Sequence, residues 1–394
     1  MSRVSTHGVP EGTRYELADS ARRRGNVLAR LHRLYELWGY ARVELPVLEH
    51  YDPAHPREPQ SFKFSDRDNG VLALRSDFTP ALAGLVRHSH SRIAAGSKEP
   101  LRLQYAGRVW HAIDPDLART REFTQIGIEL VGISNARADA ELIHLARESV
   151  RVVDLVPRVE IGNPGFVRAL LRLSEIPEKR HGRLADAIDR KDASDIENQL
   201  VEQQLAPDLR AAFHKVTELY GRPQVLEEAR RAAPWEETMR ELDRLEETLA
   251  EFEDDSELLL DLGMARRLSY YTGVTFRAYT FYFGQPLLGG GRYDGALLPY
   301  AAGFSFGLER LMLALPESKE LSRPLVVSLD DAVSRRLRTA GFVVQRALTS
   351  DVDAARRDAS NRGIPYLFSD TLESLISDPP DKDLLERALN SDDG

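Results

Sequence analysis

Two polar residues, Gln125 and Glu129, interrupt the apolar segment QIGIELVG at residues 125–132. Side chains alternate between the two faces of a β-strand, so Gln125, Gly127 and Glu129 would share one face. A buried carboxylate is costly unless a cation or a hydrogen-bond donor compensates it. The ammonium of an amino acid or an imidazole N–H could do so at Glu129, and the glycine would leave room for the ligand. This face is a candidate site for a small polar ligand.

Three further segments place polar side chains at the ends of apolar elements. They are LRSDFTP with Arg75, Asp77 and Thr79, GMARRLSYYTG with Arg266, Tyr270 and Tyr271, and GGGRYDG with Arg292 and Tyr293. An arginine fork is well suited to hold a ligand carboxylate. Taken singly, each segment also has an ordinary interpretation, because such groups occur as solvent-facing acids, surface arginine pairs, core tyrosines and glycine turns. Only the number and order of the segments favour a binding site.

Composition restricts the class of protein. The 394 residues contain 42% hydrophobic and 29% charged residues, as expected of a soluble chain with two or three domains. The sequence shows neither a membrane-length apolar run nor an apolar signal core, so we expect a cytoplasmic protein without membrane contact. It contains no cysteine, and its ten histidines form no ligand motif, so we predict no metal and no cofactor. The net charge of −9 argues mildly against binding nucleic acid.

Periodicity predicts the first set of elements. Helical spacing of apolar residues covers residues 17–39, and an alternating strand follows and stops at Pro46. A short strand at 70–75 leads into a helix that begins after Ser76 or Asp77. Residues 101–112 and 121–132 alternate on either side of about eight polar residues, which predicts a β-hairpin. A helix at 135–154 and a strand at 157–163 complete this part.

The remaining pattern divides the chain. Residues 164 to about 254 predict only helices, which indicates a helical insertion within a sheet domain. Strands resume at 257–263 and 270–281, a glycine-rich turn is expected at 287–295, and a strand leads into a helix at 301–315. Residues 317–394 predict strand–helix–strand–helix–strand. We therefore predict an α+β domain at 1–316 and a small α/β domain at 323–394.

The motifs in this order resemble those of class II aminoacyl-tRNA synthetases, and within that class the histidyl-tRNA synthetase family. LWGYARVELPVLE is similar to motif 1, YAGRVWHAIDPDLARTREFTQIGIELVG to motif 2 and AAGFSFGLERLMLAL to motif 3. ARRLSYYTG and GGGRYDG are similar to the family's two histidine-recognition motifs. The resemblance runs from about residue 9 to 316, apart from the insertion. It implies an antiparallel sheet flanked by helices, a homodimer formed through motif 1, and a shortened anticodon-binding-like domain at the C-terminus.

The resemblance also implies roles for individual residues. Asp77, Thr79 and Gln125 would hold the α-amino group of histidine, while Glu129 and Tyr271 would bind its imidazole. Arg266 would meet the carboxylate, Tyr293 would help to close the pocket, and Tyr270 is also expected among the histidine-binding residues. One departure from the family pattern lies on this side, because Ser269 stands where the family usually has an aspartate.

The nucleotide side departs further from the synthetases. His111 stands where the family has the arginine that binds the α-phosphate, and Ile113 stands where it has an acidic residue that reaches the adenine. A neutral imidazole is a poor substitute for a guanidinium, and isoleucine accepts no hydrogen bond. Arg121 and Arg310 remain as residual nucleotide-side residues, but we expect them to be insufficient for adenylation. Residues 317–394 hold 15 acidic against 11 basic residues, which is unsuited to tRNA binding.

A synthetase-like chain that keeps the histidine pocket but loses activation resembles the regulatory subunits of ATP phosphoribosyltransferase, which are paralogues of histidyl-tRNA synthetase. This resemblance implies a non-catalytic chain that binds and activates the short-form catalytic subunit and makes it sensitive to L-histidine. It implies no tRNA partner. Two alternatives stay open: a working histidyl-tRNA synthetase, and a stand-alone histidine-binding sensor with another partner.

Overall fold

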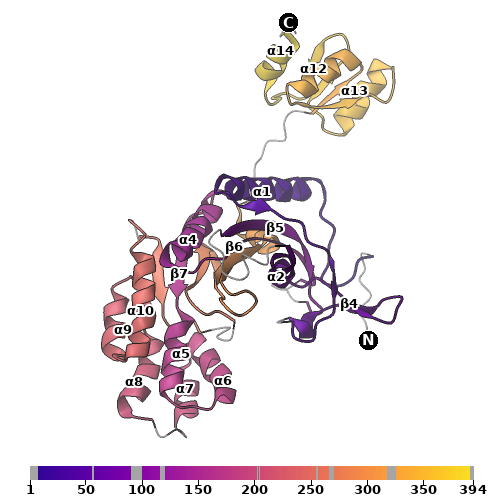
Figure 1. The fold of residues 1–394 in the computed structure, drawn as a ribbon. Helices are drawn as coiled ribbons and strands as arrows, with labels where there is room; N and C mark the ends of the chain where they lie inside the picture. The colour runs from indigo at the N-terminus through magenta and orange to yellow at the C-terminus, as the bar shows by residue number, and fades with distance from the viewer. Residues whose placement is uncertain are drawn as a thin grey trace. The chain divides into compact units, whose positions relative to one another are not determined.

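The computed structural model describes residues 8–55, 57–89, 100–115, 120–201, 203, 205–253, 256–265, 270–316 and 325–390. The chain forms two compact units, Met1–Pro316 and Glu317–Gly394 (Figure 1). Within the described residues, no helix is both long and apolar enough to cross a membrane.

The first unit is built on a nine-stranded sheet with the strand order β1-β5-β6-β12-β11-β10-β7-β9-β8. Its long strands are antiparallel, and two pairs, β1 with β5 and β7 with β9, are parallel. The hairpin predicted around residues 113–120 is confirmed, because β5 and β6 pair along their whole length. The strands are β1 (Ala41–Arg42), β5 (Leu101–Trp110), β6 (Glu122–Val131), β7 (Pro157–Gly162), β8 (Tyr220–Gly221), β9 (Leu258–Asp261), β10 (Thr275–Thr280), β11 (Phe283–Arg292) and β12 (Ala301–Gly307).

Strand β6 shows how the sheet separates its two faces. Ile126, Ile128 and Leu130 point to the face covered by α1 (Ala18–Leu37), α4 (Ala136–Arg151) and α11 (Leu308–Ala314), and they belong to the main apolar core. Gln125 and Glu129 alternate with them and face the side where α2 (Phe78–Ser89) packs. Because both faces of β6 are covered, its polar residues are buried along with its apolar ones.

The strand expected to stop at Pro46 is shorter than predicted, and a second strand that was not predicted follows the proline. Residues 41–42 form β1 in the large sheet, whereas β2 (Leu48–His50) joins β4 (Val71–Leu74) and β3 (Lys63–Ser65) in a separate three-stranded sheet. The segment between β1 and β2 is held by a side chain, since Arg75 donates from Nη1 to the carbonyls of Leu45 (2.8 Å) and Pro46 (2.9 Å). This replaces the ladder bonds that proline interrupts.

The prediction of a glycine-rich turn at 287–295 is wrong. The three glycines at 289–291 lie inside β11, between β10 and β12. A Cβ at Gly290 would collide with Phe304, and Gly291 has a φ of +153° that other residues rarely adopt. The glycines are therefore required by close neighbours in the sheet, and the chain turns only after Arg292.

Six helices form the described part of the helical insertion, and one prediction about it needs correction. The helices are α5 (Pro164–Leu173), α6 (Glu178–Asp189), α7 (Ala193–Leu200), α8 (Pro207–Val216), α9 (Val225–Ala232) and α10 (Glu236–Leu249). Asn163 begins α5 by accepting the N–H of Gly165 at 2.9 Å, and Pro164 occupies the first turn. Contrary to the expectation of helices alone, Tyr220 and Gly221 form the short strand β8, which extends the large sheet beside β9.

In residues 325–390, the second unit forms a four-stranded sheet in the order β14-β13-β15-β16 with three helices. The expected strand–helix–strand–helix–strand corresponds to β13 (Leu325–Ser328), α12 (Asp331–Thr339), β14 (Val343–Arg346), α13 (Val352–Asn361) and β15 (Tyr366–Phe368). Two elements were not anticipated, the antiparallel edge strand β16 (Leu372–Ser374) and α14 (Lys382–Asn390).

An ion pair at the end of β11 ties the sheet to α4. The side chain of Arg292 is fully buried, and its Nε donates to Asp139 Oδ1 at 2.7 Å. Its Nη1 donates to the carbonyl of Ile133 (2.9 Å) and to Asp294 (3.0 Å). Arg292, a polar residue noted in GGGRYDG, is thus structural and does not line the pocket described below.

We expect Arg292→Met to lower the free energy of unfolding of the first unit by about 3–5 kcal/mol, because it leaves the Asp139 carboxylate buried without its partner. Urea denaturation followed by tryptophan fluorescence would report this unit alone, since Trp38, Trp110 and Trp235 all lie in it. The matched change at exposed Arg33 should have little effect. Equal effects at the two positions would contradict a structural role for Arg292.

Candidate functional site

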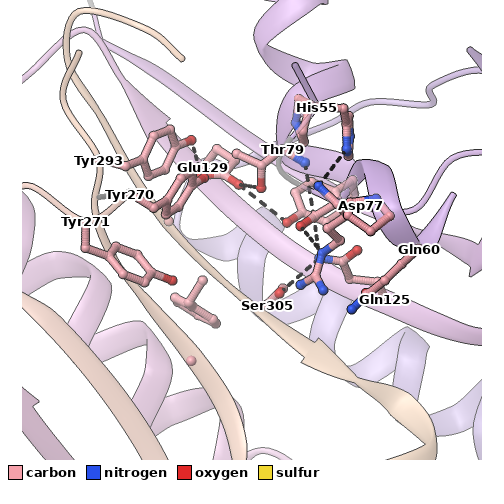
Figure 2. A pocket seen from close by; sticks show the side chains of 17 residues that line it. His55, Gln60, Asp77, Thr79, Gln125, Glu129, Tyr270, Tyr271, Tyr293 and Ser305 are labelled. Atoms are coloured by element: carbon pink, nitrogen blue, oxygen red, sulfur yellow. Dashed lines mark hydrogen bonds and ion pairs between the residues drawn. The ribbon is translucent and has the colours of Figure 1, made fainter. Parts of the chain in front are cut away.

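A pocket of about 390 Å³ opens on the face of the sheet that carries Gln125 and Glu129 (Figure 2). It receives side chains from β6 and β12, from the start of α2, from the loop between β2 and β3, and from the segment before β10. Of the eight residues predicted to bind histidine, seven line this pocket: Asp77, Thr79, Gln125, Glu129, Tyr270, Tyr271 and Tyr293. The eighth, Arg266, lies outside the described residues, as does Ser269.

Glu129 lies in the interior of the pocket wall, with 2% of its surface exposed. Its Oε1 accepts the hydroxyl of Thr79 at 3.0 Å and that of Tyr105 at 3.4 Å, and its Oε2 accepts the hydroxyl of Tyr293 at 2.7 Å. Burial raises the pKa of Glu129 to about 7, although the three hydroxyls oppose this rise. The pocket therefore holds a carboxyl group that a positive or hydrogen-bond-donating ligand would stabilise in its charged form.

Asp77 is the second acid of the pocket, and its charge is compensated by the protein. Burial alone raises its pKa, but Arg57, the amide of Gln125 and the backbone N–H of Thr79 outweigh burial and hold the pKa below its usual value. Arg57 Nε donates to Asp77 Oδ2 at 3.1 Å, and Gln125 Nε2 donates to Oδ1 at 3.0 Å. Gln125 also donates to the hydroxyl of Ser305 at 3.0 Å, which fixes its amide.

Three tyrosines form the opposite end of the pocket (Figure 2). The ring of Tyr270 stacks on that of Tyr293 with centroids 5.2 Å apart, and it meets Tyr271 edge to face at 5.1 Å. Tyr293 is 2% exposed, so its hydroxyl needs the hydrogen bond to Glu129. Such a wall could cover a flat ring while Glu129 binds its N–H.

Gly127, between Gln125 and Glu129, was expected to leave room for a ligand, and this expectation needs correction. A Cβ at Gly127 would lie 2.6 Å from the hydroxyl of Tyr105 and 2.5 Å from the carbonyl oxygen of Phe304. A Cβ at Gly303, across the ladder from Glu129, would collide with the Glu129 carboxylate. The glycines thus make room for the protein's own hydrogen-bonding groups and for the close approach of β6 and β12, and only indirectly for a ligand.

The residual nucleotide-side residues do not line the pocket. His111 is buried, its Nε2 donates to the carbonyl of Ser76 at 2.9 Å, and its ring meets Phe123 edge to face. Arg121 Nε donates to the carbonyl of Ile113 at 2.7 Å, and Arg310 Nη1 donates to that of Pro286 at 3.2 Å. Each of these side chains donates to a backbone carbonyl of its own surroundings, and none of them faces the pocket.

Sequence reasoning missed several residues that line the pocket. Tyr105 and Ser305 lie on β5 and β12, and their alternation with apolar neighbours could have placed them on this face. His55, Arg57 and Gln60 come from the irregular loop after β2, where no periodicity indicates a direction. Among the residues described, no group of three or more potential ligands is arranged to hold a metal ion.

The mostly antiparallel sheet, the hairpin of motif 2, the strand-to-helix element of motif 3 and this pocket together define a class II aminoacyl-tRNA synthetase-like protein. The histidyl-tRNA synthetase family model matches residues 12–311. The solved structure of an ATP phosphoribosyltransferase regulatory subunit/histidyl-tRNA synthetase from Bacillus halodurans superposes with a TM-score of 0.80 at 28% identity. That match covers 92% of this chain and 98% of the other.

Curated relatives identify the family within this class. The ATP phosphoribosyltransferase regulatory subunit of Thermus thermophilus is 42% identical over 91% of this chain and 96% of its own length. The ATP phosphoribosyltransferase regulatory subunit of Deinococcus radiodurans is 41% identical over 92% of this chain and 88% of its own length. The chain belongs to the ATP phosphoribosyltransferase regulatory subunit family.

The raised pKa of Glu129 leads to a prediction about stability. Its pKa is about 7 in the folded chain against 4.5 ordinarily, so ionisation of this buried group destabilises the fold as pH rises between these values. Relative to wild type, Glu129→Gln should gain about 3 kcal/mol of unfolding free energy between pH 4.5 and pH 8. Urea denaturation across this range, without ligand, measures the difference.

The control for this experiment is Glu247→Gln, which makes the same chemical change at an exposed position on α10. Its stability difference from wild type should stay level across the range. A level difference for Glu129→Gln as well would show that the carboxyl of Glu129 titrates as an ordinary one.

Proposed function

We propose that the chain is a non-catalytic regulatory subunit of ATP phosphoribosyltransferase. In this proposal it binds and activates the short-form catalytic subunit and confers feedback inhibition by L-histidine. Membership of the family supports the regulatory role. The observation that carries the histidine part is the buried carboxyl of Glu129, which faces a pocket lined by Asp77, Gln125 and three tyrosines.

The pocket offers a complementary group for each end of histidine. Asp77, with its pKa held low, would take the ammonium together with Thr79 and Gln125. Glu129 would accept an imidazole N–H between Tyr271 and the stacked pair of Tyr270 and Tyr293. The ligand would supply the donor that an ionised Glu129 needs in a buried position. Arg266 is carried over from the resemblance as a carboxylate ligand.

The nucleotide side supports the non-catalytic part. Adenylation needs fixed positive charge at the α-phosphate, a stabilisation worth several kcal/mol in such reactions. Here His111 donates to a backbone carbonyl, and Arg121 and Arg310 also bond to carbonyls outside the pocket. Residues 317–394, with 15 acidic and 11 basic residues, support the absence of a tRNA partner. A chain without cysteine fits a cytoplasmic complex that senses free histidine.

The test is phosphoribosyltransferase activity of the short-form catalytic subunit with and without this chain, across a histidine titration. We expect the chain to raise the activity and histidine to lower it. Glu129→Gln should keep the activation but shift inhibition to histidine concentrations about tenfold higher or more, because the imidazole loses a charged acceptor. Unchanged activity and unchanged inhibition on adding the chain would overturn the proposal.

The two rival functions are separated by further measurements. Histidine-dependent exchange of pyrophosphate into ATP by this chain alone would support a working synthetase. Failure to associate with the short-form subunit, combined with histidine binding in calorimetry, would support a stand-alone sensor. Glu247→Gln serves as the matched control in each assay, since this residue lies outside the pocket.

We also propose a homodimer formed through motif 1. Residues of this motif expose large apolar side chains, including Leu37 (67% exposed) and Leu48 (51%). Leu48 lies opposite Leu74 and Phe64 opposite Leu72, so Leu48 and Phe64 share one face of the small sheet β2-β4-β3. An apolar sheet face of this kind is characteristic of an interface.

We expect the chain to sediment as a dimer in analytical ultracentrifugation and Leu48→Asp to shift it towards the monomer, because a charge would be buried in the interface. The control is Leu348→Asp, a change at a leucine that is 99% exposed in the second unit. It should leave the dimer intact. A monomeric wild type, or a Leu48→Asp variant that stays dimeric, would contradict an interface at motif 1.

A further inference from the structure

The loop between β2 and β3 brings His55, Arg57 and Gln60 to the pocket. Figure 2 shows His55 and Gln60 on the side of Asp77, across the pocket from the three tyrosines. Part of this loop is a short 3-10 helix, Glu58–Gln60. Tyr51 donates its hydroxyl to Glu58 at 2.7 Å, and Lys63 also bonds to Glu58, so both ends of the loop are joined. None of its residues belongs to a motif that predicted the pocket.

Arg57 supplies positive charge to a pocket that otherwise contains two acids. Among the residues that the structure describes, it is the one arginine that lines the pocket. Its side chain is 26% exposed and bonds to Asp77 through Nε. Within the described part of the chain, no hydrogen bond occupies Nη1 or Nη2. The outer edge of the guanidinium is therefore available for a planar anion.

The charges of the Asp77–Arg57 ion pair are complementary to those of an α-amino acid. Asp77 and Arg57 lie 3.1 Å apart, while the ligand carries an ammonium and a carboxylate on a single carbon atom. An ammonium at Asp77 would place the carboxylate beside Arg57. Without Arg57, the charged residues known to line the described part of the pocket would be Asp77 and Glu129, both acidic, and buried like charges repel a carboxylate strongly.

His55 holds the backbone of Arg57 in place. Its Nδ1 accepts the backbone N–H of Arg57 at 3.0 Å, the i to i+2 pattern that Asn and Asp side chains use to form turns. Nδ1 is thereby an acceptor, so Nε2 carries the proton of the neutral ring. Burial lowers the pKa of His55, which favours that neutral form.

We infer that Arg57 binds the ligand's α-carboxylate and determines specificity for the zwitterion, and that His55 is the positioning residue that sets Arg57 in its place. This inference rests on the proposed function, because it takes histidine as the ligand of the pocket. It adds a second carboxylate-binding residue to the one expected at Arg266, and this residue comes from a part of the chain that no motif covers.

The experiment compares L-histidine with L-histidinol, which keeps the imidazole and the amine but replaces the carboxylate by a hydroxymethyl group. Isothermal titration calorimetry on the full-length chain at pH 8 gives both dissociation constants. Their ratio isolates the carboxylate, because effects on the shared amine and imidazole cancel. We expect wild type to prefer histidine and Arg57→Gln to lower this preference about tenfold or more. Affinity for histidinol should change little or improve, since Asp77 is freed for the amine.

Further variants separate the two roles. Arg57→Lys should restore part of the preference, as it keeps the charge but loses the fork. His55→Asn should keep the preference, because its side-chain oxygen can accept the Arg57 N–H, whereas His55→Phe should reduce it. Glu247→Gln, a change at an exposed residue of α10, is the control and should match wild type. Equal losses in His55→Asn and His55→Phe would overturn the positioning role.

Two outcomes would overturn the inference in distinguishable ways. Equal weakening of histidine and histidinol binding by Arg57→Gln would show that Arg57 only supports Asp77. Loss of the preference in Arg266→Gln but not in Arg57→Gln would assign the carboxylate to Arg266 alone. Absence of histidine binding to the unaltered chain would instead overturn the proposed function, and the inference with it.

Discussion

The burial of the Glu129 carboxyl on a strand covered on both faces is the constraint on which the pocket depends. A carboxyl in this position is tolerated because three hydroxyls, from Thr79, Tyr105 and Tyr293, point at it. Those hydroxyls come from α2, β5 and the turn after β11, so the group joins four parts of the chain around one side chain. Close approach of β12 in turn requires a glycine at position 303.

The hydroxyls satisfy the carboxyl without neutralising it. They are neutral donors, and burial still keeps the pKa of Glu129 at about 7. Asp77 differs, because the guanidinium of Arg57 holds its pKa low. Among the described residues, the pocket therefore carries one acid that is paired with a cation of the protein and one that is bonded to neutral hydroxyls. This asymmetry suits a ligand with a hydrogen-bonding ring at one end and an ammonium next to a carboxylate at the other.

Much of the fold followed from local pattern, and the failures have a common cause. Alternation in residues 101–132 predicted the hairpin β5–β6, and helical spacing predicted α1 and α4. The glycines at 289–291 resemble a turn in the sequence. They are in fact required because Thr275 and Phe304, on the neighbouring strands, leave no room for a Cβ at Gly291 and Gly290. Strand β8 has two residues and exists only through its ladder to β9. Tertiary neighbours decide such elements, and a single sequence does not show them.

The same distinction separates the pocket residues that were predicted from those that were missed. Gln125 and Glu129 lie on a strand, where a period of two places them on one face, and motifs supplied Asp77, Thr79 and the tyrosines. Arg57 and His55 lie in a loop whose course is set by side-chain bonds, including the Nδ1 contact and the ion pair to Asp77. Strand residues are held by ladders on both sides and cannot shift singly, whereas loop residues held by a few such bonds can. If histidine changes the state of a partner, it can do so only through contacts whose strength differs between two arrangements. Contacts made by residues of the loop can change in strength between two arrangements more readily than contacts made by residues of the strands.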